Sequence, residues 1–154
     1  MDKNLSHRED GDIVNAINIS VLNIEKLFKK LEKIPEKQNK VLQDALAEGV
    51  IMVHSHAVKS ITAHQSSGIT YGKHTASKEG FPPNSDTGQL VKSIGWEIDA
   101  SKLIATVGTN LLYGAWLEFG TKNMGARPWL YPAYKANEKK IVALINRMCE
   151  KALK

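Results

Sequence analysis

Apolar residues recur at helical spacing near the N-terminus of the chain. Within residues 13–34 they follow one another at intervals of three and four, which is typical of an amphipathic helix. Asp12 is placed to cap this helix, and Pro35 ends it because the residue before a proline disfavours the α conformation. We therefore predict a first helix over residues 13–34, preceded by a polar, disordered arm over residues 1–11.

A second helix is expected after Pro35, since proline suits the first turn of a helix. Its wide apolar face consists of Leu42, Ala45, Leu46, Gly49, Met52, Val53, Ala57 and Ile61. The small residues Ala45, Gly49 and Ala57 would let another element approach closely. The two helices would form a hairpin, or the second would lie across a sheet.

The segment from Thr62 to Gly88 contains few aliphatic residues and many glycine, serine and proline residues. Structureless loops longer than roughly 12–15 residues are uncommon in compact domains unless they are functional or disordered. We predict a long flexible loop over residues 62–88 that binds a partner and becomes ordered on assembly. A short β segment over residues 69–71 is expected at its middle.

Two alternating patterns follow this loop. Apolar residues occupy every second position over residues 94–98 and again over 103–107, which predicts two strands with one buried face each. Residues 99–101 form the turn of the resulting hairpin. A single helical turn is expected just before it, over residues 88–92. The alternation places Trp96 in the core.

The C-terminal third predicts a short helix over residues 112–119, with Gly120 as a left-handed C-terminal cap. Residues 126–131 should be extended, as a third strand, because prolines follow. Pro132 opens the last helix, whose apolar face comprises Ile141, Leu144, Ile145, Met148 and Ala152. The fold class is therefore α+β: long helices packed on a small, mainly antiparallel sheet, in a single domain over residues 12–154.

Composition narrows the functional classes. The chain has 154 residues, a formal net charge of +5 and one cysteine, Cys149, so it forms no intrachain disulfide. No apolar run approaches the roughly 20 residues of a membrane helix, and the N-terminus lacks the apolar core of a secretory signal, which favours cytoplasmic synthesis and no membrane contact. Basic and acidic residues interleave, which favours a solvated surface over a nucleic-acid-binding stripe.

We expect no catalytic, metal or cofactor site. His54 and His56 lie two positions apart on the second helix, so they face roughly opposite sides and would not bind one ion together. His64 has no positioned carboxylate or cysteine set beside it, and Cys149 falls beside an apolar helix face, which favours a packing role. A small enzyme using His64 or Cys149 is the weakest hypothesis.

Several short motifs occur in a fixed order in the C-terminal half. The motifs are DTGQLVKSI over residues 86–94, GT over 108–109, YGAWLEFGT over 113–121 and ARPWLYPA over 126–133. In order and spacing they resemble the C-terminal halves of the small head–tail joining, or tail-completion, proteins of long-tailed bacteriophages. The N-terminal half carries no comparable signature.

The resemblance implies a structural virion protein of the phage neck, made in the host cytoplasm. It would form a ring, commonly of six copies, between the tail tube or its terminator and the head connector or stopper. Genomic DNA would pass through the lumen without being read. A tail terminator and a minor capsid or head-completion protein remain alternatives, and a sequence-nonspecific nucleic-acid-binding protein is the alternative of another class.

Candidate interface residues come from two segments. Glu118 and Arg127 each sit among apolar neighbours in the sequence, where a carboxylate is costly unless paired, so we expect them to pair within one subunit or between subunits. Trp116 projects away from the predicted buried face of its helix, and Trp129 follows Arg127; tryptophan often anchors interfaces. Ile69, Tyr71 and Lys73 are the candidates in the long loop.

Overall fold

The computed structural model of the chain describes residues 39–63 and 68–152. The predicted arm over residues 1–11 and the predicted first helix over 13–34 lie outside these residues. The elements are α2 (Asn39–Thr62), β1 (Thr70–Tyr71), β2 (His74–Thr75), α3 (Gln89–Ser93), β3 (Gly95–Asp99), β4 (Ile104–Gly108), α4 (Leu112–Phe119) and α5 (Tyr131–Ala152). Long helices and two small antiparallel sheets confirm the predicted α+β class.

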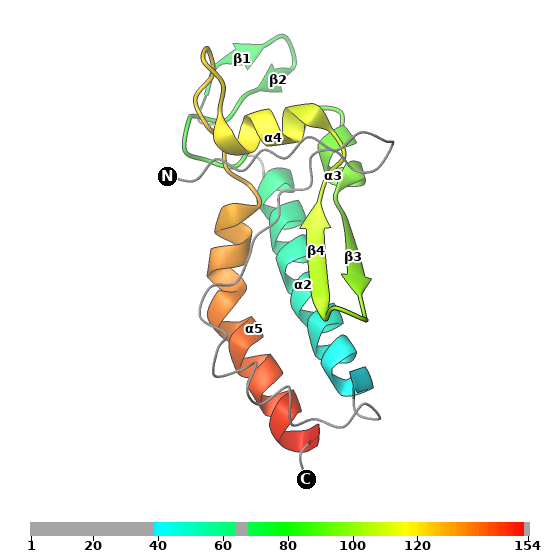
Figure 1. Cartoon of the computed structure of the whole chain (residues 1–154). Helices are drawn as coiled ribbons and strands as arrows, with labels where there is room; N and C mark the ends of the chain where they lie inside the picture. Colours follow the sequence, from blue (N-terminus) through cyan, green and yellow to red (C-terminus); the bar gives the residue numbers. More distant parts are fainter. Residues whose placement is uncertain (1–38, 64–67, 153–154) are drawn as a thin grey trace.

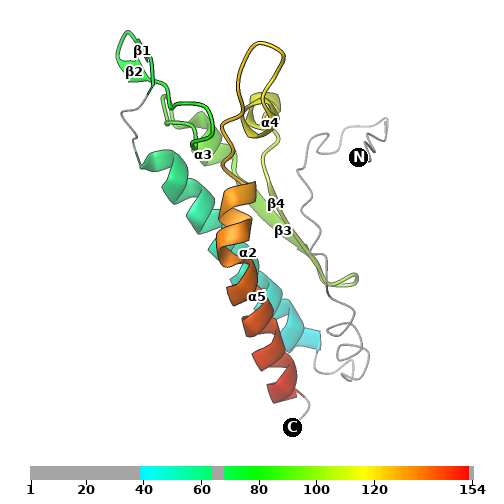
Figure 2. The same cartoon turned by 90° about the vertical axis from the view of Figure 1, so that its left-hand side faces the viewer.

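The two long helices α2 and α5 lie side by side along most of their length (Figures 1 and 2). A Cβ atom added to Gly49 would lie 3.2 Å from Cγ2 of Ile141, so the backbone of α2 approaches α5 directly at this point. Ala45 and Ala57 are fully buried. The prediction that small residues on this helix admit a close neighbour is confirmed.

The hairpin β3–β4 packs against α2. Its turn is stabilised by Asp99, whose carboxylate accepts hydrogen bonds from the hydroxyl and backbone N–H of Ser101 and from the backbone N–H of Lys102. These bonds, that from the Ser101 hydroxyl above all, hold the pKa of Asp99 well below its ordinary value. Leu103, predicted as strand, instead ends the turn with a φ of 53° and packs against Leu42 at the far end of α2.

Trp96 is not a core residue, contrary to the prediction. It stands opposite Val107 in the register of the hairpin, so the alternation assigned it to the correct face. Val107 packs against the core, whereas Trp96 remains 46% exposed. The narrow two-stranded sheet leaves much of the Trp96 ring uncovered. Alternation in the sequence predicts which side of the strand a residue lies on, but it does not predict whether another element covers that side.

The main hydrophobic core lies at the end of the molecule where α2, α3, α4 and the start of α5 meet (Figure 1). Its buried members are Val53, Ala57, Ile61, Leu90, Ile94, Trp129, Leu130, Ala133 and Tyr134. Burial raises the pKa of Tyr134, and its hydrogen-bonded neighbour Glu138 adds to this shift. Away from this core, a smaller cluster around Leu42 and Cys149 joins the N-terminal end of α2 to the C-terminal end of α5.

The predicted long loop contains regular structure where it is described. Residues 70–75 form the hairpin β1–β2, with Thr70 opposite Thr75. Further along, the Ser85 N–H donates to the Ile61 carbonyl at 3.2 Å and the Gly80 N–H donates to the Ala126 carbonyl at 2.8 Å. These bonds tie the segment to α2 and to the strip before α5. Residues 64–67 lie outside the described part.

The predicted third strand over residues 126–131 is wrong. This segment forms no strand, and α5 already begins at Tyr131. Its backbone N–H groups bind individual acceptors: the Arg127 N–H donates to the Leu117 carbonyl at 2.6 Å, and the next three amides bond to a side chain described below. Gly120 has a positive φ of 75°, but its ψ of 178° is not that of the predicted left-handed cap, which is therefore wrong. A Cβ there would lie 2.9 Å from the Met124 carbonyl oxygen.

Candidate assembly interface

Helix α4 is held in place by a hydrogen bond between two of the sequence motifs. The hydroxyls of Ser93 and Thr109 lie 2.6 Å apart, and Thr109 is only 5% exposed. The Thr109 hydroxyl also accepts the Leu111 N–H at 3.1 Å, immediately before α4 begins. The short motifs that contain Ser93 and Thr109 therefore fix the start of this helix to α3.

Gly114 allows α4 to lie directly on the core. A Cβ atom at this position would lie 2.5 Å from Cγ2 of Thr109 and 3.2 Å from Cδ1 of Leu90, closer than packed side chains tolerate. The Gly114 carbonyl accepts the indole N–H of Trp129 at 3.0 Å. The backbone of α4, rather than a side chain, forms the contact surface here.

Glu118 links α4 to the start of α5. One carboxylate oxygen accepts the N–H groups of Trp129 and Leu130 at 2.8 and 2.9 Å, and the other accepts the Tyr131 N–H at 2.9 Å. The side chain is 5% exposed. A negative charge at this point also suits the positive N-terminal end of the α5 dipole. Glu118 is thus a capping group for the segment that leads into α5.

Arg127 binds a different set of acceptors. Its Nε–H donates to the Ser77 carbonyl at 2.9 Å, and its guanidinium donates to the Gly125 carbonyl at 3.2 Å. The predicted Glu118–Arg127 pair within one subunit is therefore wrong: backbone amides satisfy the carboxylate and backbone carbonyls satisfy the guanidinium. Arg127 instead fastens the loop that carries β1–β2 to the strip before α5.

The tryptophans separate into two classes. Trp129 is 0% exposed and lies in the main core, so the structure corrects its assignment to an interface: its indole is not available to another chain. Trp116 is 49% exposed on α4, as expected. The residues that flank Trp116 and Trp129 in the sequence do not indicate that one is exposed and the other buried. The packing of α4 on the core decides this difference.

Trp116 belongs to a row of exposed apolar side chains on α4. Leu112, Trp116 and Phe119 are spaced by four and three residues, so they share one face of the helix, and they are 50%, 49% and 71% exposed. We call these three residues the α4 ridge. The only charged residue of α4 is Glu118, which is buried. Leu112 and Phe119 escaped the sequence analysis, although their spacing from Trp116 was a usable signal.

The three loop candidates are also exposed. Ile69 and Tyr71 are 67% and 64% exposed, and Lys73 lies in the turn between β1 and β2. Figures 1 and 2 both place β1, β2 and α4 at the same end of the molecule, opposite the C-terminal end of α5. The exposed apolar side chains of β1 and the α4 ridge therefore gather at one end.

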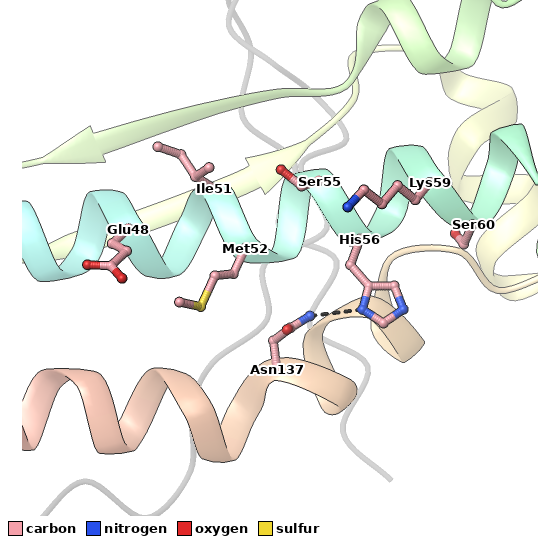
Figure 3. Close-up of a pocket in the computed structure, with 8 residues that line it drawn as sticks. All are labelled: Glu48, Ile51, Met52, Ser55, His56, Lys59, Ser60 and Asn137. Atoms are coloured by element: carbon pink, nitrogen blue, oxygen red, sulfur yellow. Dashed lines mark hydrogen bonds between the residues drawn. The ribbon is translucent and has the colours of Figure 1, made fainter.

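A shallow open groove runs between α2 and α5. Its lining, drawn in Figure 3, comprises Glu48, Ile51, Met52, Ser55, His56, Lys59, Ser60 and Asn137. Nδ2 of Asn137 lies 3.0 Å from Nδ1 of His56, and the Ser60 hydroxyl donates to the Ala57 carbonyl at 2.8 Å. The His56 ring and the Ser60 hydroxyl thus bond to groups of α5 and α2, respectively, and not to each other as a base and a nucleophile would.

The remaining chemical candidates are dispersed. His54 bonds to the Ile94 carbonyl at 3.2 Å, on the side of α2 facing the hairpin, whereas His56 faces α5, as the spacing predicted. Cys149 is fully buried against Leu42, and His64 lies outside the described residues. Within residues 39–63 and 68–152, no three histidine, cysteine or acidic side chains gather closely enough to hold a metal ion. None of the helices described there is long and apolar enough to span a membrane.

Comparison with known proteins gives the family. Residues 25–120, more than half of the chain, match the model of the HK97-gp10-like family, described as "Bacteriophage HK97-gp10, putative tail-component". No curated protein and no solved structure gives a significant match. The matched segment includes the hydrogen-bonded frame of Ser93 and Thr109, Glu118 and the whole α4 ridge. The chain therefore belongs to the HK97-gp10-like family of bacteriophage tail components.

Proposed function

We propose that this tail component is a tail-completion protein, a structural and non-catalytic ring in the phage neck that links the tail tube or its terminator to the head connector. The observation that carries the proposal is the α4 ridge. Three large apolar side chains stand exposed on a short helix whose other side is fixed to the core by Thr109, Gly114 and Glu118. Such a ridge serves as an assembly surface.

The chemistry of the ridge suits a contact with another protein chain. Interface centres are depleted in charged residues and enriched in aromatic residues, and tryptophan is the commonest anchor. The ridge presents Trp116 and Phe119, and the only charge on its helix is buried. If the ridge meets a different surface of the next copy, the contact is head-to-tail, and such contacts close into a ring when the rotation permits.

The remaining features of the proposal rest on the resemblance of the motifs. A ring of six copies would match a hexameric tail tube, and the exposed residues Ile69, Tyr71 and Lys73, in and beside β1, would reach the neighbouring ring of the neck. The protein would be made in the host cytoplasm and incorporated into the virion, and genomic DNA would pass through the lumen. Tail termination and head completion are the alternative positions in the particle.

Replacing Trp116 and Phe119 together by serine is expected to convert the oligomer into a monomer. Loss of an anchor residue weakens a contact by about 2 kcal/mol or more, which is roughly 30-fold in the dissociation constant for each anchor. Light scattering coupled to size-exclusion chromatography measures the change. Trp96→Ser, which removes an equally exposed tryptophan (46%) from the hairpin, is the matched control and should leave the oligomer intact. An unchanged oligomer in the double variant would contradict the role of the ridge.

Electron microscopy of lysates from a phage lacking this gene tests the position in the particle. Tail completion predicts full heads and finished tails that lie separate, since each assembles alone and only the joining step fails. Overlong tails would indicate a terminator instead, and empty or leaking heads a head-completion protein. Normal virions would contradict all three assignments.

A further inference from the structure

The outward side of α5 carries a basic face, which we define as Lys139, Lys140, Arg147 and Lys151. All four side chains are exposed. Positions three, four, seven, eight and eleven residues apart share one side of a helix, so these four and the exposed Ala136 and Ala143 form one strip. The four basic residues, from Lys139 to Lys151, extend over about 18 Å, at about 1.5 Å per residue. The sequence shows these basic residues, but the acids interleaved with them favoured a solvated surface over a stripe.

No cation of this face is held in an ion pair within the described part of the chain. Lys135 and Lys102 each form an ion pair, with Glu138 at 2.9 Å and with Asp99 at 3.1 Å, respectively. None of the four cations of the basic face forms an ion pair or a side-chain hydrogen bond among residues 39–63 and 68–152. Glu138 bonds to Lys135 and Tyr134, and its pKa is lowered by Lys135 first and also by the nearby charge of Lys139. Glu150, an exposed acid on the strip, has an interaction of its own.

We propose that the α5 basic face binds the phosphate backbone of duplex DNA without reading its sequence. Nonspecific DNA binding is carried by lysine and arginine contacts to phosphates. A length of about 18 Å spans about five base pairs of duplex DNA at a rise of about 3.4 Å, which is enough for the four cations to reach phosphates. The strip has no glutamine or aromatic residue with which to read or stack on bases, and the amide of Asn146 at its edge donates to the Val142 carbonyl at 2.9 Å.

An acidic protein partner fits this face less well. Protein interfaces are depleted in lysine and built around aromatic or large apolar anchors, whereas the only apolar residues on the strip are Ala136 and Ala143. None of the large exposed apolar residues of the described segments belongs to the strip; they are the α4 ridge, Ile51, Ile69, Tyr71, Phe81, Trp96, Ile104 and Tyr131. The inference goes beyond the proposed neck ring and does not depend on it, because the basic face and the α4 ridge are separate surfaces.

Fluorescence anisotropy with a labelled random-sequence 30-base-pair duplex tests the proposal on the full chain. Four phosphate contacts predict a slope near −3.6 for the logarithm of the binding constant against that of salt concentration, or about 100-fold weaker binding at 200 than at 50 mM salt. The triple variant Lys139→Gln, Lys140→Gln, Arg147→Gln should reduce the slope to about −0.9. The matched control, Lys78→Gln, Lys92→Gln, Lys122→Gln, removes the same charge from exposed positions elsewhere and should keep the wild-type slope.

Three results would overturn the proposal. Absence of salt-sensitive binding at 50 mM salt would show that the face does not bind phosphates. An equal loss in both triple variants would assign binding to overall charge rather than to α5. Displacement of the duplex by polyglutamate at matched charge concentration would make an acidic protein the better partner. The ridge variant with Trp116→Ser and Phe119→Ser should keep the wild-type slope even as a monomer, which separates failure of this proposal from failure of the ring.

Discussion

Glu118→Ala should destabilise the fold by about 3–5 kcal/mol, the cost typical of removing one partner from a buried charged network. The carboxylate accepts three backbone N–H groups, at 2.8, 2.9 and 2.9 Å, from the residues that lead into α5. Trp129 and Leu130 are fully buried, so their amides would lose their acceptor where water does not replace it. Urea unfolding followed by circular dichroism measures the change.

Glu118→Gln separates the loss of acceptors from the loss of volume. Glutamine keeps one acceptor oxygen but turns an amide NH₂ toward one of the N–H groups, so we expect an intermediate loss of about 1–3 kcal/mol. Glu97→Ala, at an exposed position of β3, is the control and should change stability by less than about 0.5 kcal/mol. If Glu118→Ala unfolded at the wild-type urea concentration, the three bonds would have no part in holding α5.

Trp129→Ala is expected to cost about 3–5 kcal/mol, or to prevent folding, because it leaves a cavity at the centre of the main core. Trp129 is 0% exposed, contacts the backbone side of α4 near Gly114 and donates its indole N–H to the Gly114 carbonyl at 3.0 Å. The variant therefore loses packing and leaves a buried carbonyl without its donor. Differential scanning calorimetry of the purified chain measures the fall in melting temperature.

Two further substitutions sharpen this test. Trp129→Phe fills most of the volume but lacks the N–H, so its loss of stability should be smaller and reports mainly on the bond to Gly114. Trp96→Ala removes a tryptophan that is 46% exposed and should cost far less than Trp129→Ala. Equal effects of Trp96→Ala and Trp129→Ala would mean that Trp129 is not central to the core.

The motifs that carried the family resemblance have a physical explanation in the fold. Ser93 and Thr109 bond to each other, Gly114 lies where a Cβ would collide with Thr109, and Glu118 holds the amides that lead into α5. Most of the motif residues thus build the frame that holds α4 against the core. The residues that we propose as the contact surface, Leu112 and Phe119 beside Trp116, project from that frame.

Local patterns determined the elements of this protein. The alternation over residues 94–107 predicted the β3–β4 hairpin, and the small residues of α2 predicted the close approach of another element, found as α5 beside Gly49. Helix α4 was predicted over the residues that it occupies. These features follow from periodicity and residue size, which act over a few neighbouring residues and are therefore visible in the sequence.

Tertiary structure alone decided which side chains are available to a partner. Whether Trp129 or Trp96 is buried depends on what covers each, and the partners of Glu118 and Arg127 are backbone groups brought together by the folding of distant segments. The basic face of α5 likewise exists only because packing on α2 turns one side of that helix outward. The burial of a side chain and the direction of a backbone N–H or carbonyl group depend on contacts between segments far apart in the chain. A local sequence pattern does not predict such contacts.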